Sequence, residues 1–407
     1  MAHCRSCNHI LQHEMINLVN APASNSFLRF DQLDERESFY PLKVYVCEKC
    51  FLVQIAEYKS AGEIFSSDYA YFSSFSRSWL DHCEKYVNSV VERFRLTTHS
   101  RVVEVASNDG YLLQFFKNKN IPQLGVEPTL GTAEAAMAKG IKTIIRFFGE
   151  KCAQDIVDKE GKADLIAANN VLGHVPDIND FVKGIKTLLH EKGAMTAEFP
   201  HLMQLVKFNQ FDTIYHEHFS YLSLTAVLQV FKQNGLRVFD VEEIPTHGGS
   251  LRIFVDHGDV HPLENSVSLL LKREESASMT NLNYYTRFQE VAHHIKYQFL
   301  KFLIDSKMAQ KKVVGYGAAA KGNTLLNFCG VKQDLVDFVV DASPHKQGKF
   351  LPASHIPVVA EKRLRETQPD FVIILPWNLR DEITAQISYI REWGGRFVIA
   401  IPELKIF

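Results

Sequence analysis

The stretch that decides the fold is Arg101-Val-Val-Glu-Val-Ala-Ser-Asn-Asp-Gly110. It reads as a strand, a turn of small residues, and then a helix that starts at Tyr111. A turn of this kind leaves backbone N–H groups and a helix N-terminus facing a ligand. Of the usual G-x-G-x-x-G pattern only Gly110 remains, because Ala106 and Asn108 stand in the places of glycines. The turn therefore favours a ligand without phosphates over a dinucleotide.

The segments after this turn continue the alternation of strands and helices. A second strand, Gln123–Glu127, ends in an acid about 20 residues on, where an acceptor of ribose hydroxyls is expected. A third strand-like segment, Ala163–Leu172, leads into Gly173-His174-Val-Pro-Asp177. This alternation predicts a parallel sheet, with ligands bound beyond the carboxyl ends of its strands. The polar residues at or near those ends are Glu104, Asn108, Glu127, Asn170 and His174.

Two further strand-like pieces predict an antiparallel edge on the same sheet. Strand Ala194–Phe199 is followed by a polar stretch and by a helix over Leu224–Asn234. The two pieces, Leu236–Ile244 and Ser250–Asp256, are joined by Thr246-His-Gly-Gly-Ser250. The glycines are consistent with a hairpin connection or with a close approach of the backbone.

A second α/β unit follows a charged bridge with helical spacing over residues 262–311. It begins with Lys312-Val-Val-Gly-Tyr-Gly-Ala-Ala-Ala-Lys-Gly-Asn-Thr324, which again reads as strand, small-residue turn and helix. Gly315, Gly317 and Lys321 suit a phosphate better than the first turn does. The strands expected after it are Val336–Asp341, Phe371–Leu375 and Phe397–Ile401. The alternative is a Rossmann-like scaffold that binds nothing.

Four of the seven cysteines form two C-x-x-C pairs, Cys4-Arg-Ser-Cys7 and Cys47-Glu-Lys-Cys50. Each pair places two thiolates on a tight turn, and four thiolates suit tetrahedral Zn²⁺ with no open position. We therefore expect a zinc that folds the N-terminal domain and does not catalyse, with Ile16–Pro41 as a loop closed by the metal. A redox dithiol and plain surface thiols are the alternatives. The cysteines expected only to pack are Cys83, Cys152 and Cys329.

The chain has 407 residues, which predicts two or three domains. Its 46% hydrophobic and 23% charged residues are typical of a globular protein in water. A formal net charge of -2 provides no basic field, so no nucleic-acid partner is expected. No apolar run reaches the roughly 18 residues that a membrane span needs, and the polar N-terminus does not resemble a signal peptide. The cytoplasm is the expected location, because its reducing conditions leave cysteines available for metal.

The stretch Tyr215-His-Glu-His-Phe-Ser-Tyr221 concentrates two imidazoles, a carboxylate and two phenols. Imidazole suits proton abstraction at physiological pH because its unperturbed pKa lies near neutrality. A neighbouring carboxylate can orient it, and a phenol can donate a hydrogen bond to a developing oxyanion. Taken alone, this stretch could equally be a solvated polar loop. Upstream, the aromatic segment Ser66–Ser74 contains Tyr69 and Tyr71, which either line a cleft or anchor domains to each other.

Together these motifs resemble the family of sugar C-methyltransferases that modify thymidine-diphosphate (TDP) 4-keto-deoxysugars. The resemblance spans nearly the whole chain and includes the two C-x-x-C pairs. Its other motifs are Asp68-Tyr-Ala-Tyr-Phe-Ser-Ser74, Glu104-Val-Ala-Ser-Asn-Asp-Gly-Tyr111, Asn170-Val-Leu-Gly-His-Val-Pro-Asp177, Glu198-Phe-Pro-His201, Phe211-Asp-Thr-Ile-Tyr-His-Glu-His-Phe-Ser220, His247-Gly-Gly-Ser-Leu-Arg252 and Gly315-Tyr-Gly-Ala-Ala-Ala-Lys-Gly-Asn323.

The resemblance implies an α/β protein of three domains, expected to be a monomer. Residues 1–75 would bind structural zinc, and residues 76–258 would form a Rossmann-like domain that binds S-adenosylmethionine. Residues 259–407 would form a second Rossmann-like domain that binds the nucleotide sugar. The residues implied to hold the zinc are Cys4, Cys7, Cys47 and Cys50. Those implied to contact S-adenosylmethionine are Glu104, Ala106, Asn108, Gly110, Tyr111, Glu127, Pro128, Asn169 and Asn170.

The resemblance also implies a mechanism. His218 would take a proton from a sugar carbon next to the ketone, with C3 preferred and C5 left open, and the enolate would attack the methyl group of S-adenosylmethionine. The residues implied to assist are Tyr215, Glu217, His174 and Tyr71. Those implied to contact the nucleotide sugar are Tyr69, His201, Tyr221, His247, Lys321, Asn323, His345 and Lys346.

Two other functions remain open from the sequence. A nicotinamide-dependent oxidoreductase of nucleotide sugars would use the Gly315–Gly322 turn, although the glycines missing from Ala106–Gly110 disfavour a dinucleotide there. A non-catalytic nucleotide-sugar-binding protein is disfavoured by the dense polar cluster at Tyr215–Tyr221. A catalytic metal is also disfavoured, because the spacing of its four candidate ligands is not H-E-x-x-H. Those candidates are His201, His216, Glu217 and His218.

Overall fold

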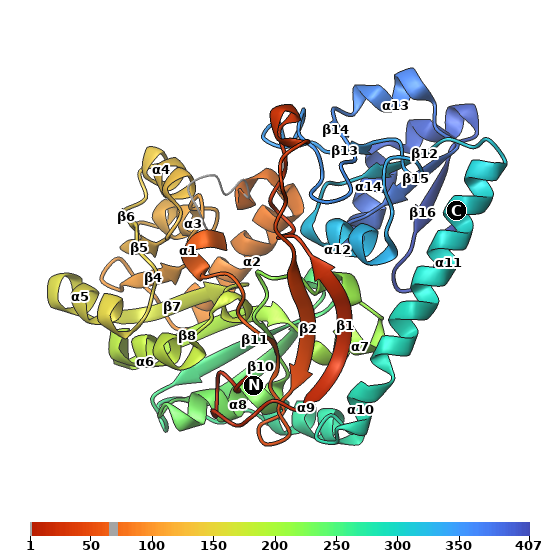
Figure 1. Ribbon diagram of the computed structural model, residues 1–407. Coiled ribbons are helices and arrows are strands. Elements are labelled where there is room, and N and C mark those ends of the chain that lie inside the picture. Colours follow the sequence, from red (N-terminus) through yellow and green to blue (C-terminus); the bar gives the residue numbers. More distant parts are fainter. Residues whose placement is uncertain (1, 65–71) are drawn as a thin grey trace.

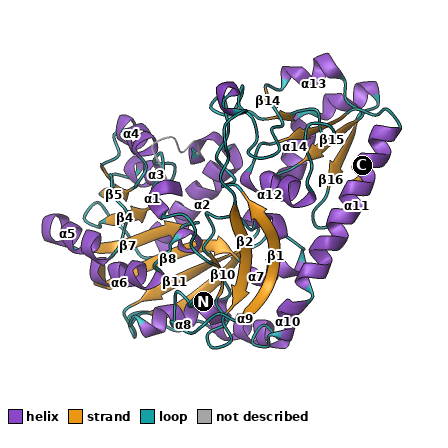
Figure 2. Ribbon diagram, viewed as in Figure 1, coloured by secondary structure: helices purple, strands orange, loops and turns teal. Residues whose placement is uncertain are grey.

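The computed structural model describes residues 2–64 and 72–407 of the chain (Figure 1). Three sheets, of four, seven and six strands, organise the described residues. Figure 2 shows that helices cover the two larger sheets, and the strands β1 and β2 lie at the front of the view. None of the helices in the described parts of the chain is long and apolar enough to span a bilayer.

The four-stranded sheet joins the N-terminal region to the middle of the chain. Its strands are β1 (His13–Ala21), β2 (Tyr40–Val46), β3 (Val53–Ile55) and β9 (Ser220–Tyr221), paired antiparallel in that order. The prediction that Ile16–Pro41 forms one loop is wrong at both ends. Ile16 and Leu18 are buried residues of β1, and Pro41 belongs to β2. A short helix, α1 (Ala61–Ile64), follows β3.

The connection between β1 and β2 extends away from this sheet to the C-terminal region, where its red hairpin meets the blue part of the chain (Figure 1). It contains the 3-10 helix Phe30–Gln32. Leu28 forms an antiparallel bridge with Phe350. The Glu37 carboxylate accepts hydrogen bonds from Nε2 of His355 at 2.6 Å and from the backbone N–H of Ala353 at 2.9 Å. The N-terminal region is therefore fastened to the last third of the chain.

The seven-stranded sheet is the largest. Its strands are β4 (Val102–Val105), β5 (Gln123–Val126), β6 (Thr143–Ile144), β7 (Ala163–Asn169), β8 (Leu189–Pro200), β10 (Arg237–Ile244) and β11 (Ser250–Asp256). They are ordered β10-β11-β8-β7-β4-β5-β6. Strands β4 to β8 are parallel, and β11 and β10 add the antiparallel edge. The parallel sheet and its antiparallel edge, both predicted from the sequence, are confirmed.

Helices pack on both faces of this sheet (Figure 1). They are α2 (Arg77–Arg93), α3 (Leu113–Asn118), α4 (Leu130–Ala138), α5 (Glu150–Glu160), α6 (Ile178–Leu188), α7 (Leu202–Lys207) and α8 (Leu224–Gln233). Three of them begin at a side chain that accepts a backbone N–H: Ser76 caps α2, Asp177 caps α6 and Ser223 caps α8. Such caps satisfy N–H groups that have no partner within the helix.

The bridge predicted after the sheet is helical and consists of α9 (Asn265–Ser276), α10 (Asn283–Thr286) and the long α11 (Phe288–Met308). The six-stranded sheet follows, in the order β14-β13-β12-β15-β16-β17. Its strands are β12 (Val313–Tyr316), β13 (Val339–Val340), β14 (Val358–Val359), β15 (Phe371–Ile374), β16 (Arg396–Ile399) and the antiparallel β17 (Lys405–Ile406). Its helices are α12 (Ala320–Cys329), α13 (Lys362–Thr367) and α14 (Arg380–Gln386).

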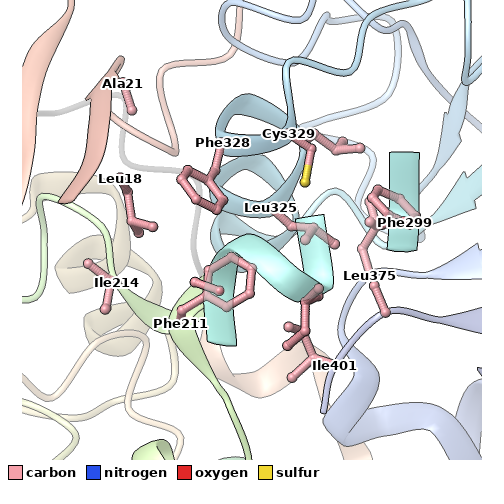
Figure 3. Close-up of a cluster of buried hydrophobic side chains, with 14 of the residues drawn as sticks. Leu18, Ala21, Phe211, Ile214, Phe299, Leu325, Phe328, Cys329, Leu375 and Ile401 are labelled. Atoms are coloured by element: carbon pink, nitrogen blue, oxygen red, sulfur yellow. The ribbon is translucent and has the colours of Figure 1, made fainter. Parts of the chain in front are cut away.

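One hydrophobic cluster connects all three parts of the chain (Figure 3). Leu18 comes from β1, Phe211 and Ile214 come from the segment before the Tyr215–Tyr221 stretch, and Phe328 comes from α12. The rings of Phe211 and Phe328 meet edge to face with centroids 5.5 Å apart. Because buried apolar contacts are closely packed and resist displacement, this cluster fixes the position of the residues that follow Ile214.

Candidate active site

The four cysteines of the C-x-x-C pairs gather as predicted. Their sulfur atoms all lie within 4.8 Å of one another. Cys4 and Cys50 are 3.5 Å apart at sulfur, and Cys7 and Cys47 are 3.6 Å apart. Four thiolates around zinc at about 2.3 Å place neighbouring sulfur atoms about 3.8 Å apart, so these residues fit the ion. Zinc held in this way has a structural role, because no coordination position is left for substrate.

The two pairs have the same backbone geometry. Asn8 and Phe51, each directly after the second cysteine of its pair, have φ angles of 59° and 55°. Their N–H groups donate to the carbonyls of Cys4 and Cys47 at 2.9 and 2.8 Å. Each turn therefore points two thiols at a common centre. Among the residues that the structure describes, this is the one group of cysteine, histidine and acidic side chains that could hold a metal.

Unpaired polar atoms collect at the carboxyl ends of β4 and β7, where the cofactor was predicted to bind. Both amide atoms of Asn169 are buried without a hydrogen-bond partner in the described residues, and the buried carboxylate of Glu104 lies close to the side chain of Tyr111. Burial, together with the charges of Glu127 and Asp109, raises the pKa of Glu104 well above its ordinary value. Buried polar atoms without partners are costly, so this cluster fits a polar, positively charged ligand such as S-adenosylmethionine.

The turn after β4 is held in an unusual backbone conformation. Ala106, Asn108 and Gly110 have φ angles of 56°, 47° and 76°. A Cβ atom at Gly110 would lie 2.3 Å from the side chain of Ile141, which explains the one retained glycine. The Glu127 carboxylate accepts the N–H of Asn108 at 2.9 Å and so ties the ends of β4 and β5 together. Strained backbone that the surrounding fold supports is common at ligand sites.

Two other residues predicted to contact the cofactor flank this turn. Tyr111 is buried directly after Gly110. Pro128 follows Glu127 and precedes α4.

His218 is fixed in one tautomer. Its Nδ1 atom lies 2.7 Å from the carbonyl oxygen of Thr213, and because a carbonyl only accepts, Nδ1 carries the proton. The lone pair is therefore on Nε2. Burial lowers the pKa of His218 well below its ordinary value, and the charges of His174 and Lys321 add to the effect. The imidazole is thus neutral at physiological pH, which is the form that a base needs.

His174 lies against His218 but comes from a different segment of the chain. It follows β7 in the 3-10 helix Leu172–His174, and its Nδ1 donates to the carbonyl of Glu217 at 2.8 Å. The two imidazole centroids are 4.6 Å apart, and the Tyr215 ring lies 4.0 Å from His218. Burial lowers the pKa of His174 to about 4. The structure thus brings Tyr215, His174 and His218 together beside the end of β7.

The carboxylate of Glu217 faces the N-terminal region. Both of its oxygens accept from the side-chain amide of Asn25, at 2.7 and 2.9 Å. Burial raises the pKa of Glu217 to about 7, although Asn25 opposes the shift. Tyr221 lies in β9 with its hydroxyl buried and unpaired among the described residues. Glu217 and Tyr221 therefore belong to the side of the site that the four-stranded sheet builds.

The residues predicted to contact the nucleotide sugar are found in several places. His247 has a φ angle of 55° and its Nε2 lies 3.3 Å from Nδ2 of Asn170, so it adjoins the end of β7. Lys321 lies in the first turn of α12, and its charge is felt by His218 and His247. His201, by contrast, is buried beside α9, where its Nε2 is 2.7 Å from the Glu274 carboxylate.

Three others lie farther along the C-terminal unit. Asn323 is buried and donates to the carbonyl of Ser24 at 2.6 Å. His345 stacks on Phe72 with centroids 5.5 Å apart. Lys346 donates to the carbonyl of Ala318 at 2.8 Å, in the turn between β12 and α12. Tyr69 and Tyr71 lie outside the described residues.

The sequence analysis missed several residues that adjoin this site. Trp79 of α2 lies 5.3 Å from His247 and 6.0 Å from Tyr111, centroid to centroid. Asn25 and Trp377 contact Glu217 and Asp212. Single asparagines and tryptophans far from any motif carry no sequence signal. Of these residues, only Asp212 could have been predicted as a site residue from the sequence, because it lies inside the Phe211–Ser220 motif.

Comparison with known proteins matches three successive parts of the chain to domain families. Residues 4–65 match a zinc binding domain, residues 79–241 a methyltransferase domain and residues 245–402 a C-methyltransferase C-terminal domain. The C-methyltransferase NovU of Streptomyces niveus is 33% identical over 404 residues, which cover 99% of this chain and 96% of NovU. The chain belongs to this C-methyltransferase family. It is an S-adenosylmethionine-dependent enzyme with a zinc-binding domain.

Among solved structures, this C-methyltransferase matches other methyltransferases over less than half of its length and at low identity. An S-adenosylmethionine-dependent methyltransferase from Clostridium acetobutylicum is 10% identical, with a TM-score of 0.35 over 44% of this chain and 92% of its own. One from Anabaena variabilis is 15% identical, with a TM-score of 0.36 over 43% of this chain and 84% of its own.

Proposed function

We propose that the enzyme methylates a carbon next to the ketone of a TDP-4-keto-deoxysugar, at C3, with His218 as the general base. The observation that supports this most is the tautomer of His218. Its proton on Nδ1 is held by the carbonyl of Thr213, so Nε2 keeps an available lone pair. A neutral imidazole whose orientation is fixed in this way can accept a proton without first losing one.

Proton removal next to a ketone leaves an enolate, whose negative charge must be stabilised. His174 and Tyr215 adjoin His218, with ring centroids 4.6 and 4.0 Å away, and we assign them to positioning the sugar ring against the base. Glu217 keeps the turn in place through its carbonyl, which accepts from His174, and through its carboxylate, which accepts from Asn25. We keep Tyr71, from outside the described residues, as a further assistant.

We assign the cofactor to the cluster of unpaired polar atoms at the ends of β4 and β7. S-adenosylmethionine carries its methyl group on a sulfonium, which an enolate carbon can attack. His174 follows β7 by a few residues and contacts His218, so the base and the cofactor cluster are joined through one short segment. This proximity lets the two substrates react as neighbours, which lowers the entropic part of the barrier.

For the nucleotide part of the substrate, we propose the C-terminal unit. Gly317, with a φ angle of 89°, and the N-terminus of α12 form a turn that Lys346 reaches. Such a turn presents N–H groups to phosphate oxygens. We retain His201, Asn323, Tyr69 and His345 as sugar contacts on the family resemblance alone. We further propose a cytoplasmic monomer without a nucleic-acid partner.

One experiment tests the reaction directly. The enzyme is incubated with S-adenosylmethionine labelled at its methyl group and with a panel of TDP-4-keto-deoxysugars, and the new carbon is located by NMR. A methyl group on C3 supports the proposal, and one on C5 corrects the position while keeping the chemistry. A label found on oxygen or nitrogen, or a requirement for a nicotinamide nucleotide, would refute it.

A further inference from the structure

Lys321 is placed differently from a lysine that only binds phosphate. It is half-buried in the first turn of α12, and its Nζ donates to Oδ1 of Asn378 at 2.7 Å. The ammonium also lies 4.7 Å from the centre of the Trp377 ring. An ammonium has three N–H groups, and in the described residues only one of these has a hydrogen-bond partner.

Trp377 ties this lysine to two parts of the active site. Its Nε1 donates to the Asp212 carboxylate at 2.7 Å. On another edge, a Cβ atom built on Gly248 would lie 2.6 Å from a carbon of the Trp377 ring. The ring is therefore pressed against the backbone next to His247. Lys321 thus sits over a side chain that touches both the segment before His218 and the turn that holds His247.

Asp212 completes the surroundings of the ammonium. It is fully buried, and its carboxylate lies close to its own backbone and to that of Thr213. Burial raises the pKa of Asp212 to about 6, and the charge of Lys321 opposes the shift. Asp212 directly precedes Thr213, whose carbonyl fixes the tautomer of His218. One short 3-10 helix, Phe211–Thr213, thus carries the carboxylate of Asp212 and the carbonyl that orients His218.

The charge of Lys321 reaches the imidazoles. Burial lowers the pKa of His247 to about 4, and Lys321 adds to the shift, as it also does at His218. Lys321 is therefore close enough to both imidazoles for its charge to disfavour their protonation. The turn between β12 and α12, where a phosphate would bind, has a different lysine, because Lys346 donates to the carbonyl of Ala318 there.

We propose that Lys321 is a catalytic residue that stabilises the oxyanion formed at the ketone oxygen. This inference rests on the proposed function. As the C–H bond next to the ketone breaks, the proton goes to Nε2 of His218 and the electron pair moves through the new C–C double bond onto oxygen. Lys321 donates a hydrogen bond to that oxygen and keeps its proton. When the carbon forms its bond to the methyl group, the C=O bond forms again and S-adenosylhomocysteine leaves.

The geometry applies to either neighbouring carbon, since C3 and C5 share the same C4 oxygen. Asp212, Trp377 and Asn378 act through Lys321 and are positioning residues. An oxyanion donor fixed before the reaction contributes to kcat rather than to substrate affinity, whereas a phosphate ligand contributes to KM. This difference separates the two roles of Lys321.

The test measures enolate formation apart from methyl transfer. Wild-type enzyme, Lys321→Met and the control Lys207→Met are incubated with a TDP-4-keto-deoxysugar in D₂O without S-adenosylmethionine, and deuterium next to the ketone is followed by NMR. Lys207 is an exposed lysine that also lies over a ring, that of Phe208, at 5.3 Å. We expect Lys321→Met to lose about 10²–10³-fold in exchange and in kcat, with KM for the nucleotide sugar nearly unchanged.

A variant that keeps wild-type exchange and kcat but has a raised KM would overturn the proposal and return Lys321 to phosphate binding. Failure of the proposed function looks different, because wild-type enzyme would then show neither exchange nor methylation. Folding is checked through the thermal shift given by S-adenosylhomocysteine. Should Lys321→Met fail this check, the same measurements are made on Asn378→Leu. This substitution removes the acceptor that orients the ammonium, so it should lower exchange without changing KM.

Discussion

The carbonyl oxygen of Thr213 lies 2.7 Å from Nδ1 of His218 and leaves Nε2 as the proton acceptor. Replacing His218 by Asn should lower kcat by about 10²–10⁴-fold, because an amide cannot act as a general base. Binding of S-adenosylhomocysteine should stay the same, since its predicted contacts lie at the carboxyl ends of β4, β5 and β7. Steady-state kinetics and calorimetry check the two results. Wild-type turnover in this variant would remove His218 from the mechanism.

Glu217 should make thermal stability depend on pH. Its pKa rises from 4.5 to about 7 in the folded enzyme. Between these values the folded state keeps a proton that the unfolded chain has released, so stability falls as pH rises through that window. Glu217→Gln should flatten this slope, measured as the change in Tm between pH 5 and pH 7. An equal slope in both proteins would contradict the burial of this carboxyl.

Asn25 should affect the same slope in the opposite direction. Its amide stabilises the charged form of Glu217 through two hydrogen bonds. Asn25→Leu should therefore raise the pKa of Glu217 further and steepen the loss of Tm with rising pH. Asn20→Leu is the matched control, because Asn20 is exposed in β1, close to the same connection. If both variants gave the wild-type slope, the Asn25–Glu217 contact would have no role in solution.

Removing zinc should unfold the N-terminal region and stop the reaction. Structural zinc contributes folding free energy directly, so Cys47→Ser or a strong chelator should lower Tm and remove the bound metal. Activity should fall with it, because β9, at the end of the Tyr215–Tyr221 stretch that we propose to be catalytic, pairs with β3. Metal analysis and calorimetry measure the effect, with Cys152→Ser, away from the cluster, as the control. Full activity in zinc-free enzyme would contradict this dependence.

Glu104 should link cofactor binding to pH. Burial raises its pKa in the empty site, whereas a cationic ligand favours the carboxylate. Binding of S-adenosylhomocysteine, whose amino group is charged, should then release a proton and strengthen as pH rises. Glu104→Gln should bind about 10- to 100-fold more weakly and without this proton release. Calorimetry in buffers of different ionisation enthalpy checks this, with exposed Glu84→Gln as the control.

The sequence was sufficient for the parts that local patterns determine. The spacing of Cys4, Cys7, Cys47 and Cys50 predicted a cluster that the structure contains. Strand Ser250–Asp256 was predicted with the bounds that it has, because Gly248 and Gly249 mark its start and Ile253, Phe254 and Val255 favour strands. The Tyr-His-Glu-His motif pointed to His218, although its role as the base stays a prediction.

Other features depend on contacts between distant residues and left no local signal. The pairing of Gln54 with Ser220 joins segments more than a hundred residues apart, and nothing in either segment specifies the partner. Trp377 reaches Asp212 from the last strand–helix unit for the same reason. The segment before Tyr40 was predicted as a loop because its many polar residues obscure the pattern of buried residues in β1, where the segment starts.

The two-residue strand β9 has a practical consequence for chimeric enzymes. Val53 pairs with Tyr221 and Gln54 with Ser220. The N-terminal region with the four cysteines therefore provides the strand with which the chain just after His218 pairs. A slip of one residue would turn Tyr221 to the opposite face of the sheet. Exchanging the first 60 or so residues between relatives should therefore succeed only when the partner strand travels with them.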